Sequence, residues 1–202
     1  DVRRINYYGG AGRDLTPYHQ QVEDNILDRL VTDLEESSAY RQRRRDIVAH
    51  NAASKVLKKG IALTPVKFGI SFTATWYNQA GALVHVYSDG SIHLNHGGTE
   101  MGQGLNTKVA QVVAEAFQVD FERIKITKTT TEKVPNTSAT AASSGTDLNG
   151  MAALDAVEQI KARLVSFAAE RWSVAPDAVR FVANQVHVGD EVLSFDAFIR
   201  QA

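Results

Sequence analysis

Hydrophobic residues recur at helical spacing in the first third of the chain. After Thr16, which can cap a helix, and Pro17, which favours a first helical position, apolar residues follow an i, i+4, i+5, i+8 pattern. The positions that share this spacing are Val22, Ile26, Leu27, Leu30, Val31 and Leu34. The pattern predicts an amphipathic helix, followed by a second helix over residues 38–59 that Gly60 closes.

The hydrophobic period changes to that of strands at Ile61. Residues 61–77 are rich in β-branched and aromatic side chains, which predicts one long strand or two joined at Pro65 or Gly69. Residues 82–88 and 91–96 flank Asp89-Gly90 and alternate in polarity, which predicts a hairpin with a type I′ turn. On the first strand Val84 and Val86 would share one face, and on the second Ile92 and Leu94 would do the same.

The second half of the chain alternates between helical and extended patterns. A helix is predicted over residues 105–118, a strand over 122–131, and a helix of about 25 residues ending at Trp172. Between them, residues 134–146 are small and polar, which indicates a long loop. A hairpin over residues 179–182 and 185–188, a turn at 189–190 and a short helix capped by Ser194 complete the pattern.

This order of elements favours an α+β fold with a mixed or antiparallel sheet, β-hairpins and packed helices, because hairpins as well as helices connect the strands. We expect residues 1–60 to form a helical N-terminal segment that packs on an α+β subdomain over residues 61–202. The sequence begins with Asp1, and we expect it to be a fragment of a larger subunit.

Composition narrows the function classes. A chain of 202 residues with 44% hydrophobic and 22% charged residues is typical of a globular protein, and a net charge of −1 argues against nucleic acid as the main partner. The absence of cysteine excludes disulfides and iron–sulfur ligation by this segment. No apolar run reaches the length of a membrane span, so we expect a cytoplasmic location and no membrane partner.

A glycine-rich stretch joins the first hairpin to the following helix. Residues 97–105 hold four of the fourteen glycines, and such a turn presents backbone N–H groups and a helix N-terminus to an anion. The alternative is a tight connection without a ligand. A basic run over residues 41–45 has the same two interpretations, an anion site or a solvated helix face, and the acidic residues nearby favour the second.

Common site motifs are missing from the glycine-rich stretch. No Lys-Ser/Thr pair follows Gly104, as a phosphate-binding P-loop needs, and Thr107 stands where a dinucleotide fingerprint needs its third glycine. His85, His93 and His96 lie on the hairpin without a further ligand at metal spacing, so we interpret them as surface histidines. No serine has the surroundings of a hydrolase nucleophile.

Two donor-rich loops that each precede a helix remain. Gln103 lies between two glycines of the first loop, and Thr140, Ser143 and Ser144 lie in the second. If the loops converge, they can hold a polar, phosphorylated cofactor without charged side chains, and the Gln103 amide can bind a heterocycle edge. Alternatively, Gln103 pins its own turn and Ser143 caps the next helix.

Three motifs carry a resemblance to a known family. Gly-Gly-Thr-Glu-Met-Gly-Gln-Gly-Leu at 97–105, Val-Pro-Asn-Thr-Ser-Ala-Thr-Ala-Ala-Ser at 134–143 and Lys-Phe-Gly-Ile-Ser-Phe-Thr at 67–73 resemble the molybdopterin-binding part of the xanthine dehydrogenase/oxidase family of molybdenum hydroxylases. The similarity extends to residues 1–8 and 78–82.

The resemblance implies a role for particular residues. The cofactor-binding set would be Gly102, Gln103, Gly104, Thr140, Ala141, Ala142 and Ser143. Within it, Gln103 would contact the pterin and the backbone N–H of Ala142 would lie near the molybdenum, with no direct metal ligand from this chain. Phe72 would stack against a purine substrate and Thr73 would hydrogen-bond to it. The catalytic glutamate of the family belongs to a motif absent here, and neither Glu100 nor Glu132 replaces it.

The resemblance also implies an activity and partners. The family hydroxylates hypoxanthine and xanthine to urate, and electrons pass through 2Fe-2S clusters and FAD, carried on other domains or subunits, to NAD. We expect an oligomer in which this chain joins the remaining segments of the enzyme, and no turnover by residues 1–202 alone. Two alternatives stay open: an aldehyde oxidase-type hydroxylase segment and a non-catalytic interaction module.

Overall fold

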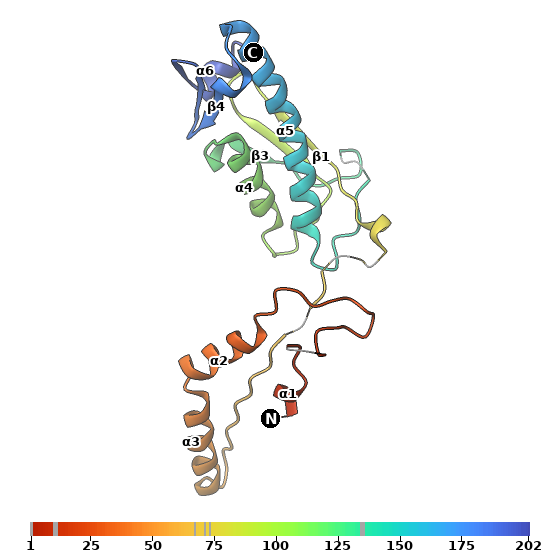
Figure 1. The fold of residues 1–202 in the computed structure, drawn as a ribbon, viewed down its shortest axis with the longest axis vertical. Helices are drawn as coiled ribbons and strands as arrows, with labels where there is room; N and C mark the ends of the chain where they lie inside the picture. Colours follow the sequence, from red (N-terminus) through yellow and green to blue (C-terminus); the bar gives the residue numbers. More distant parts are fainter. Residues whose placement is uncertain (1, 10–11, 67, 71, 73, 134–135) are drawn as a thin grey trace. The chain divides into compact units, whose positions relative to one another are not determined.

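The chain divides into two compact units, which are described separately. The computed structural model describes residues 2–9, 12–66, 68–70, 72, 74–133 and 136–202. Unit 1 is Asp1–Phe68 and unit 2 is Gly69–Ala202 (Figure 1). The domain boundary expected between residues 60 and 61 stays a prediction. None of the helices in the described part of the chain is long and apolar enough to cross a membrane.

The described residues of unit 1 form three helices, α1 (Val2–Ile5), α2 (Leu27–Ser37) and α3 (Tyr40–Ala53). The prediction that the first long helix starts after Pro17 is wrong. The Thr16 hydroxyl accepts a hydrogen bond from the Gln20 amide at 2.9 Å and closes a turn instead of capping a helix.

Helix α2 begins ten residues after Pro17, and its start has a local cause. The Asn25 side-chain oxygen accepts a hydrogen bond from the Leu27 amide at 3.0 Å, an interaction typical of asparagine just before a helix. Helix α3 ends at Ala53, because Ser54 has an extended backbone with ψ 128°, so the predicted closure at Gly60 is also wrong.

The long strand predicted over residues 61–77 is not formed by the residues described there. They follow an irregular path that ends in the 3₁₀ helix η1 (Thr75–Tyr77). Val66, Phe68 and Ile70 are exposed, and none of the described residues of this segment pairs with a strand. Composition alone does not make a strand, because β-branched residues favour one only where a partner strand is present.

Unit 2 begins with a three-stranded mixed sheet. β1 (Ala82–Val86) pairs antiparallel with β2 (Ile92–His96), with Val84 opposite Leu94, and β2 pairs parallel with β3 (Ile124–Ile126). The hairpin is confirmed, but its turn is not type I′. Gly90 has φ +79° while Asp89 stays outside the left-handed region, and the Gly90 amide donates to Tyr87, as in a type I turn followed by a left-handed glycine.

Two helices pack against this sheet and a second sheet follows. The predicted helices are confirmed as α4 (Leu105–Phe117) and α5 (Gly145–Trp172), and the C-terminal hairpin as β4 (Val179–Val182) with β5 (Gln185–Val188). Strand β6 (Glu191–Ser194) was not predicted. Besides η1, the described residues of unit 2 form three further short helices: η2 (Phe121–Arg123), η3 (Pro176–Ala178) and α6 (Phe195–Ile199), the last capped by Ser194 as expected.

One core joins these elements. Ile92 and Leu94 from the first sheet, Phe117 from α4 and Phe195 and Phe198 from α6 are all fully buried. Helix α5 reaches both sheets and packs along α4, and both helices begin at the same end of unit 2 (Figure 1). The architecture is therefore α+β, as predicted, and it places the segments before α4 and α5 next to each other.

Candidate cofactor-binding site

The two loops that precede α4 and α5 meet. The Thr99 amide in the first donates to the Thr140 hydroxyl in the second at 2.9 Å, across 41 positions of sequence. Both loops line a cavity of about 340 Å³, whose residues are Met101, Gln103, Leu105, Lys108, Thr140, Ala141, Ser143, Gly145 and Thr146. The convergence expected from the sequence is thus present in the structure.

Two glycines allow this close approach of the backbones. A Cβ atom on Gly97 would collide with the Thr137 side chain, and one on Gly98 would collide with Leu105 and lie 2.9 Å from the Asn149 amide nitrogen. The Thr129 hydroxyl, three residues after the end of β3, donates to the carbonyl oxygen of Gly98 at 3.0 Å. Glycine is therefore needed here for space.

The first loop folds onto one of its own carboxylates. Glu100 accepts three backbone N–H groups: Oε1 from Gly102 at 2.9 Å and from Gly104 at 3.0 Å, and Oε2 from Asn106 at 3.0 Å. These bonds, that from Asn106 foremost, lower the pKa of Glu100 and keep it ionised. The expectation that this turn offers its amides to an external anion is wrong for these three positions.

The Gln103 side chain also bonds within the first loop. Its Oε1 accepts from the Met101 amide at 2.6 Å and its Nε2 donates to the Thr99 carbonyl at 2.9 Å. A primary amide has two donor hydrogens and two acceptor lone pairs, so one of each remains for a ligand. Gln103 therefore pins its turn, as the alternative interpretation held, and still presents hydrogen-bonding capacity at the cavity.

The second loop holds two non-glycine residues in a strained backbone conformation and does not bond its helix amides with its own side chains. Ala142 and Ser143 both have φ +53°, a left-handed conformation that is strained for residues with a Cβ atom. Ser144, rather than Ser143, is the N-cap of α5, and its hydroxyl bonds the Ala141 carbonyl rather than a helix amide.

The first amides of α5 are open. Within the described residues, the backbone N–H groups of Gly145, Thr146 and Asp147 donate no hydrogen bond. Such a helix N-terminus, with the positive end of the helix dipole behind it, favours an anion. Gly145 and Thr146 line the cavity, so these amides lie beside it.

A buried histidine supports the base of the first loop. His96 is only 2% exposed, and its Nδ1 accepts a hydrogen bond from the Gly98 amide at 3.1 Å. Burial lowers the pKa of His96 and favours the neutral ring, whereas the nearby Asn106 side chain and the charge of Glu100 oppose this shift. The interpretation of this residue as a surface histidine is wrong; His85 and His93 do pair across the hairpin.

The proposed substrate residues lie in the segment before β1. Phe72 is half-buried, and its backbone is held by Asn78, which accepts from the Phe72 amide at 3.1 Å and donates to its carbonyl at 2.8 Å. Phe72 is not among the residues that line the cavity described above. Thr73 lies outside the described residues. The substrate role of both residues stays a prediction.

Sequence reasoning missed two further residues of the site. Lys108 places its side chain at the cavity one turn into α4, and Asn149 packs against Gly98 from α5. Lysine on a helix and asparagine within one carry no signal until the helices are paired. Glu100 carried a signal that was not used, an acidic residue four positions before Gly104, the N-cap of α4.

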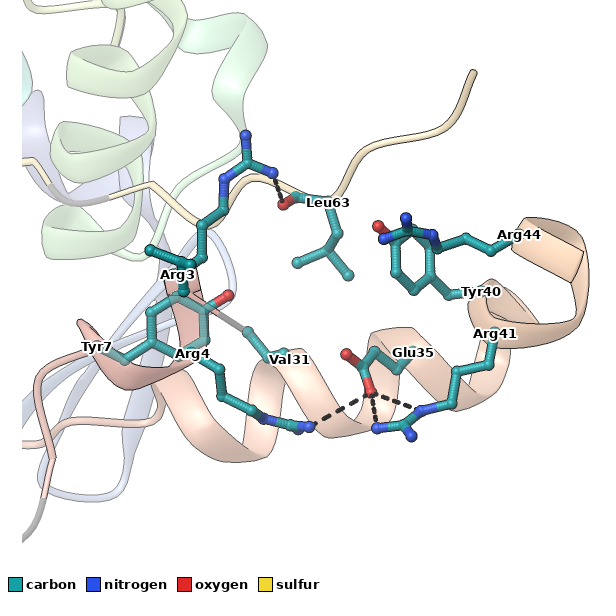
Figure 2. Close-up of a pocket in the computed structure, with 10 residues that line it drawn as sticks. Arg3, Arg4, Tyr7, Val31, Glu35, Tyr40, Arg41, Arg44 and Leu63 are labelled. Carbon is teal, nitrogen blue, oxygen red and sulfur yellow. Dashed lines mark hydrogen bonds and ion pairs between the residues drawn. The ribbon is translucent and has the colours of Figure 1, made fainter. Parts of the chain in front are cut away.

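Unit 1 has a separate cavity of about 440 Å³ lined by four arginines (Figure 2). Its cations are engaged within the unit, since Glu35 pairs with Arg41 at 3.1 Å and with Arg4 at 3.7 Å. Arg3 donates to the Leu63 carbonyl at 3.0 Å. These internal pairings favour the interpretation of the basic run as a solvated helix face.

Comparison with known proteins identifies relatives of the whole site region. The sequence profile of the molybdopterin cofactor-binding domain matches residues 33–202. Xanthine dehydrogenase of Dictyostelium discoideum is 50% identical over 163 residues, and xanthine dehydrogenase/oxidase of Felis catus is 48% identical over 167 residues. The alignments cover 81% and 83% of this chain but 12% of each relative, so the chain spans about an eighth of their length.

Solved structures share the fold at lower identity. Quinoline 2-oxidoreductase from Pseudomonas putida 86 matches with a TM-score of 0.78 and 18% identity, covering 98% of this chain and 26% of that one. A Cu,Mo-CO dehydrogenase matches with a TM-score of 0.54 and 23% identity, over 59% of this chain and 16% of its own. With the profile match over most of its length, the chain belongs to the molybdopterin cofactor-binding domain family.

Proposed function

We propose that this chain is the part of a xanthine dehydrogenase that binds the molybdenum–molybdopterin cofactor and the purine substrate. The observation that carries the proposal is the meeting of the two loops at one cavity, joined by the Thr99–Thr140 hydrogen bond, in a chain of this family. The substrate class follows from relatives named xanthine dehydrogenase at about half identity.

The donor set of the cavity fits this cofactor. A pterin presents ring nitrogens and an exocyclic amine and oxygen, which match the spare donor and acceptor of Gln103. A Cβ atom on Gly102 or Gly104 would meet nothing within 4 Å, so the backbone beside Gln103 faces open space. The phosphate of the cofactor matches the open amides that begin α5 and the Lys108 ammonium.

Each part of the chain has a defined task in this proposal. Gln103, with Gly102 and Gly104, orients the pterin; Thr140 holds the two loops together; the left-handed Ala142 aims its amide toward the metal end. When bound, the cofactor supplies the redox chemistry that hydroxylates the substrate carbon. Phe72 and Thr73 position the planar substrate, and the proton-accepting glutamate is expected outside this segment.

The remaining parts of the proposal concern the longer enzyme. We place the 2Fe-2S clusters and FAD on other domains or subunits, which carry electrons to NAD, in a cytoplasmic oligomer. The presence of further domains or subunits is supported by relatives that are about eight times as long as the matched segment.

The test uses the complete enzyme that contains this chain. We expect about one molybdenum per copy of the chain by elemental analysis, and urate formation from hypoxanthine and xanthine. A panel of aromatic aldehydes in the same assay separates the purine from the aldehyde substrate class. Absence of molybdenum would overturn the cofactor assignment, and aldehyde turnover without urate formation would overturn the substrate assignment. Residues 1–202 alone are expected to show no turnover.

A further inference from the structure

Glu100 is exposed, yet its carboxylate bonds to the chain itself. Both oxygens are used, and the three amides they accept belong to Gly102, Gly104 and Asn106, on either side of Gln103. The carboxylate thus fixes the backbone before and after the residue that presents its side chain to the cavity.

The backbone that Glu100 holds is otherwise poorly determined. Gly102 and Gly104 have φ +97° and +75°, and glycine populates this region about as readily as the right-handed one. Without the carboxylate, two flexible glycines would flank Gln103, and the bonds of Gln103 to Met101 and Thr99 would have to hold the turn alone.

Glu100 also determines which helix N-terminus is open to an anion. Its negative charge lies at the start of α4, where it meets the amides of Gly104 and Asn106. The start of α5 differs: its N-cap Ser144 makes no side-chain bond to a helix amide, and within the described residues Asp147, the acidic residue of its first turn, accepts none from those amides.

We propose that Glu100 is a positioning residue for the cofactor: it sets the geometry of the Gln103 turn and occupies the start of α4, so that the anionic group of the cofactor is directed to the start of α5. The inference rests on the proposed function. It assigns Glu100 no proton transfer and no contact with the substrate.

Three variants of the complete enzyme test this role. Glu100→Ala removes all three hydrogen bonds. Glu100→Gln keeps the shape and one acceptor oxygen but places an NH₂ group against one of the amides. Glu158→Gln is the matched control, an exposed glutamate on α5 whose interaction is an ion pair with Lys161 at 3.3 Å.

The readouts are molybdenum content, the rate of cofactor loss on dilution and the visible absorption of the cofactor, alongside the thermal unfolding temperature. We expect Glu100→Ala to lose cofactor at least tenfold faster, Glu100→Gln to lose it several-fold faster with an unchanged unfolding temperature, and Glu158→Gln to match the wild type. A change in cofactor loss and absorption without a change in unfolding separates positioning from general structural support.

Failure of the proposed function and failure of the role of Glu100 give different results. A wild-type enzyme without molybdenum would overturn the proposed function itself. A wild-type enzyme with molybdenum, together with Glu100→Gln that retains the cofactor as the wild type does, would overturn the role of Glu100 alone. That second result decides the matter even if Glu100→Ala does not fold.

Discussion

The two loops at the cavity occupy equivalent places before a helix but differ in how their hydrogen bonds are made. Both are poor in large side chains and both lead into a helix, but the loop before α4 bonds to its own Glu100 and Gln103. The loop before α5 leaves its helix amides open and holds Ala142 and Ser143 in a strained conformation. The difference shows that a run of small residues before a helix can have its backbone amides bonded by a carboxylate of the same run, as Glu100 does, or left available to a ligand.

The largest expected effect comes from giving the open loop an anion of its own. Ala142→Asp in the complete enzyme places a carboxylate close to the α5 amides, where it repels the cofactor phosphate. We expect molybdenum content to fall at least tenfold, measured by elemental analysis. Ala139→Asp, in the same loop and exposed, is the control and should keep its molybdenum. Normal molybdenum in Ala142→Asp would favour the interaction-module alternative.

The next effect tests how closely the two loops must approach. Gly98→Ala adds a methyl group that collides with Leu105 and Asn149, so we expect the free energy of unfolding to fall by about 1–3 kcal/mol. Urea unfolding followed by tryptophan fluorescence measures this, because Trp172 lies in the same unit. Gly69→Ala, in the same unit and with nothing within 4 Å of the added methyl group, should change stability little. Equal stabilities of the two variants would contradict the tight packing at Gly98.

A smaller effect is expected from removing the hydrogen bond between the loops. Thr140→Val keeps the side-chain shape but leaves the Thr99 amide without its acceptor, a loss of about 1 kcal/mol. In the complete enzyme we expect cofactor to dissociate several-fold faster, measured by the loss of its absorption after dilution. Thr131→Val, at an exposed position outside the cavity, serves as the control. Equal rates would show that the loops do not need this link.

The smallest effect concerns the pH dependence of the supporting histidine. Burial lowers the pKa of His96 in the folded chain below the ordinary value of 6.5. Its contribution to stability is therefore fully present above about pH 6.5 and is lost as pH falls from there towards the folded pKa. We expect the wild type to lose more stability than His96→Gln between pH 7 and pH 5 in urea titrations. Parallel curves would contradict this role.

Local patterns predicted the elements that are stabilised by neighbours in sequence. The first hairpin, α4, α5 and the pairing of β4 with β5 follow from alternation and helical spacing. The segment at 61–77 shows the limit, because β-branched residues favour a strand only where a partner strand is present. Strand β6 has only four residues, too short for a pattern of its own, and pairs with the edge that β5 presents.

In the site, too, local sequence patterns predicted some features, whereas others depend on contacts between distant residues. Sequence motifs located both loops, but they did not reveal that Glu100 satisfies the amides of one loop and leaves the other open. That distinction depends on which way a side chain turns over a glycine-rich backbone. Lys108 reaches the cavity only because α4 and α5 start at the same end of the unit.

The contact between Thr99 and Thr140 has a consequence for assembly of the holoenzyme. It closes a loop of 41 residues, and the length-dependent part of that closure costs about 3 kcal/mol of chain entropy. The binding cavity therefore does not exist in the unfolded polypeptide. The prosthetic group is a ligand of the native state, so its binding is coupled to folding and stabilises the folded form by mass action.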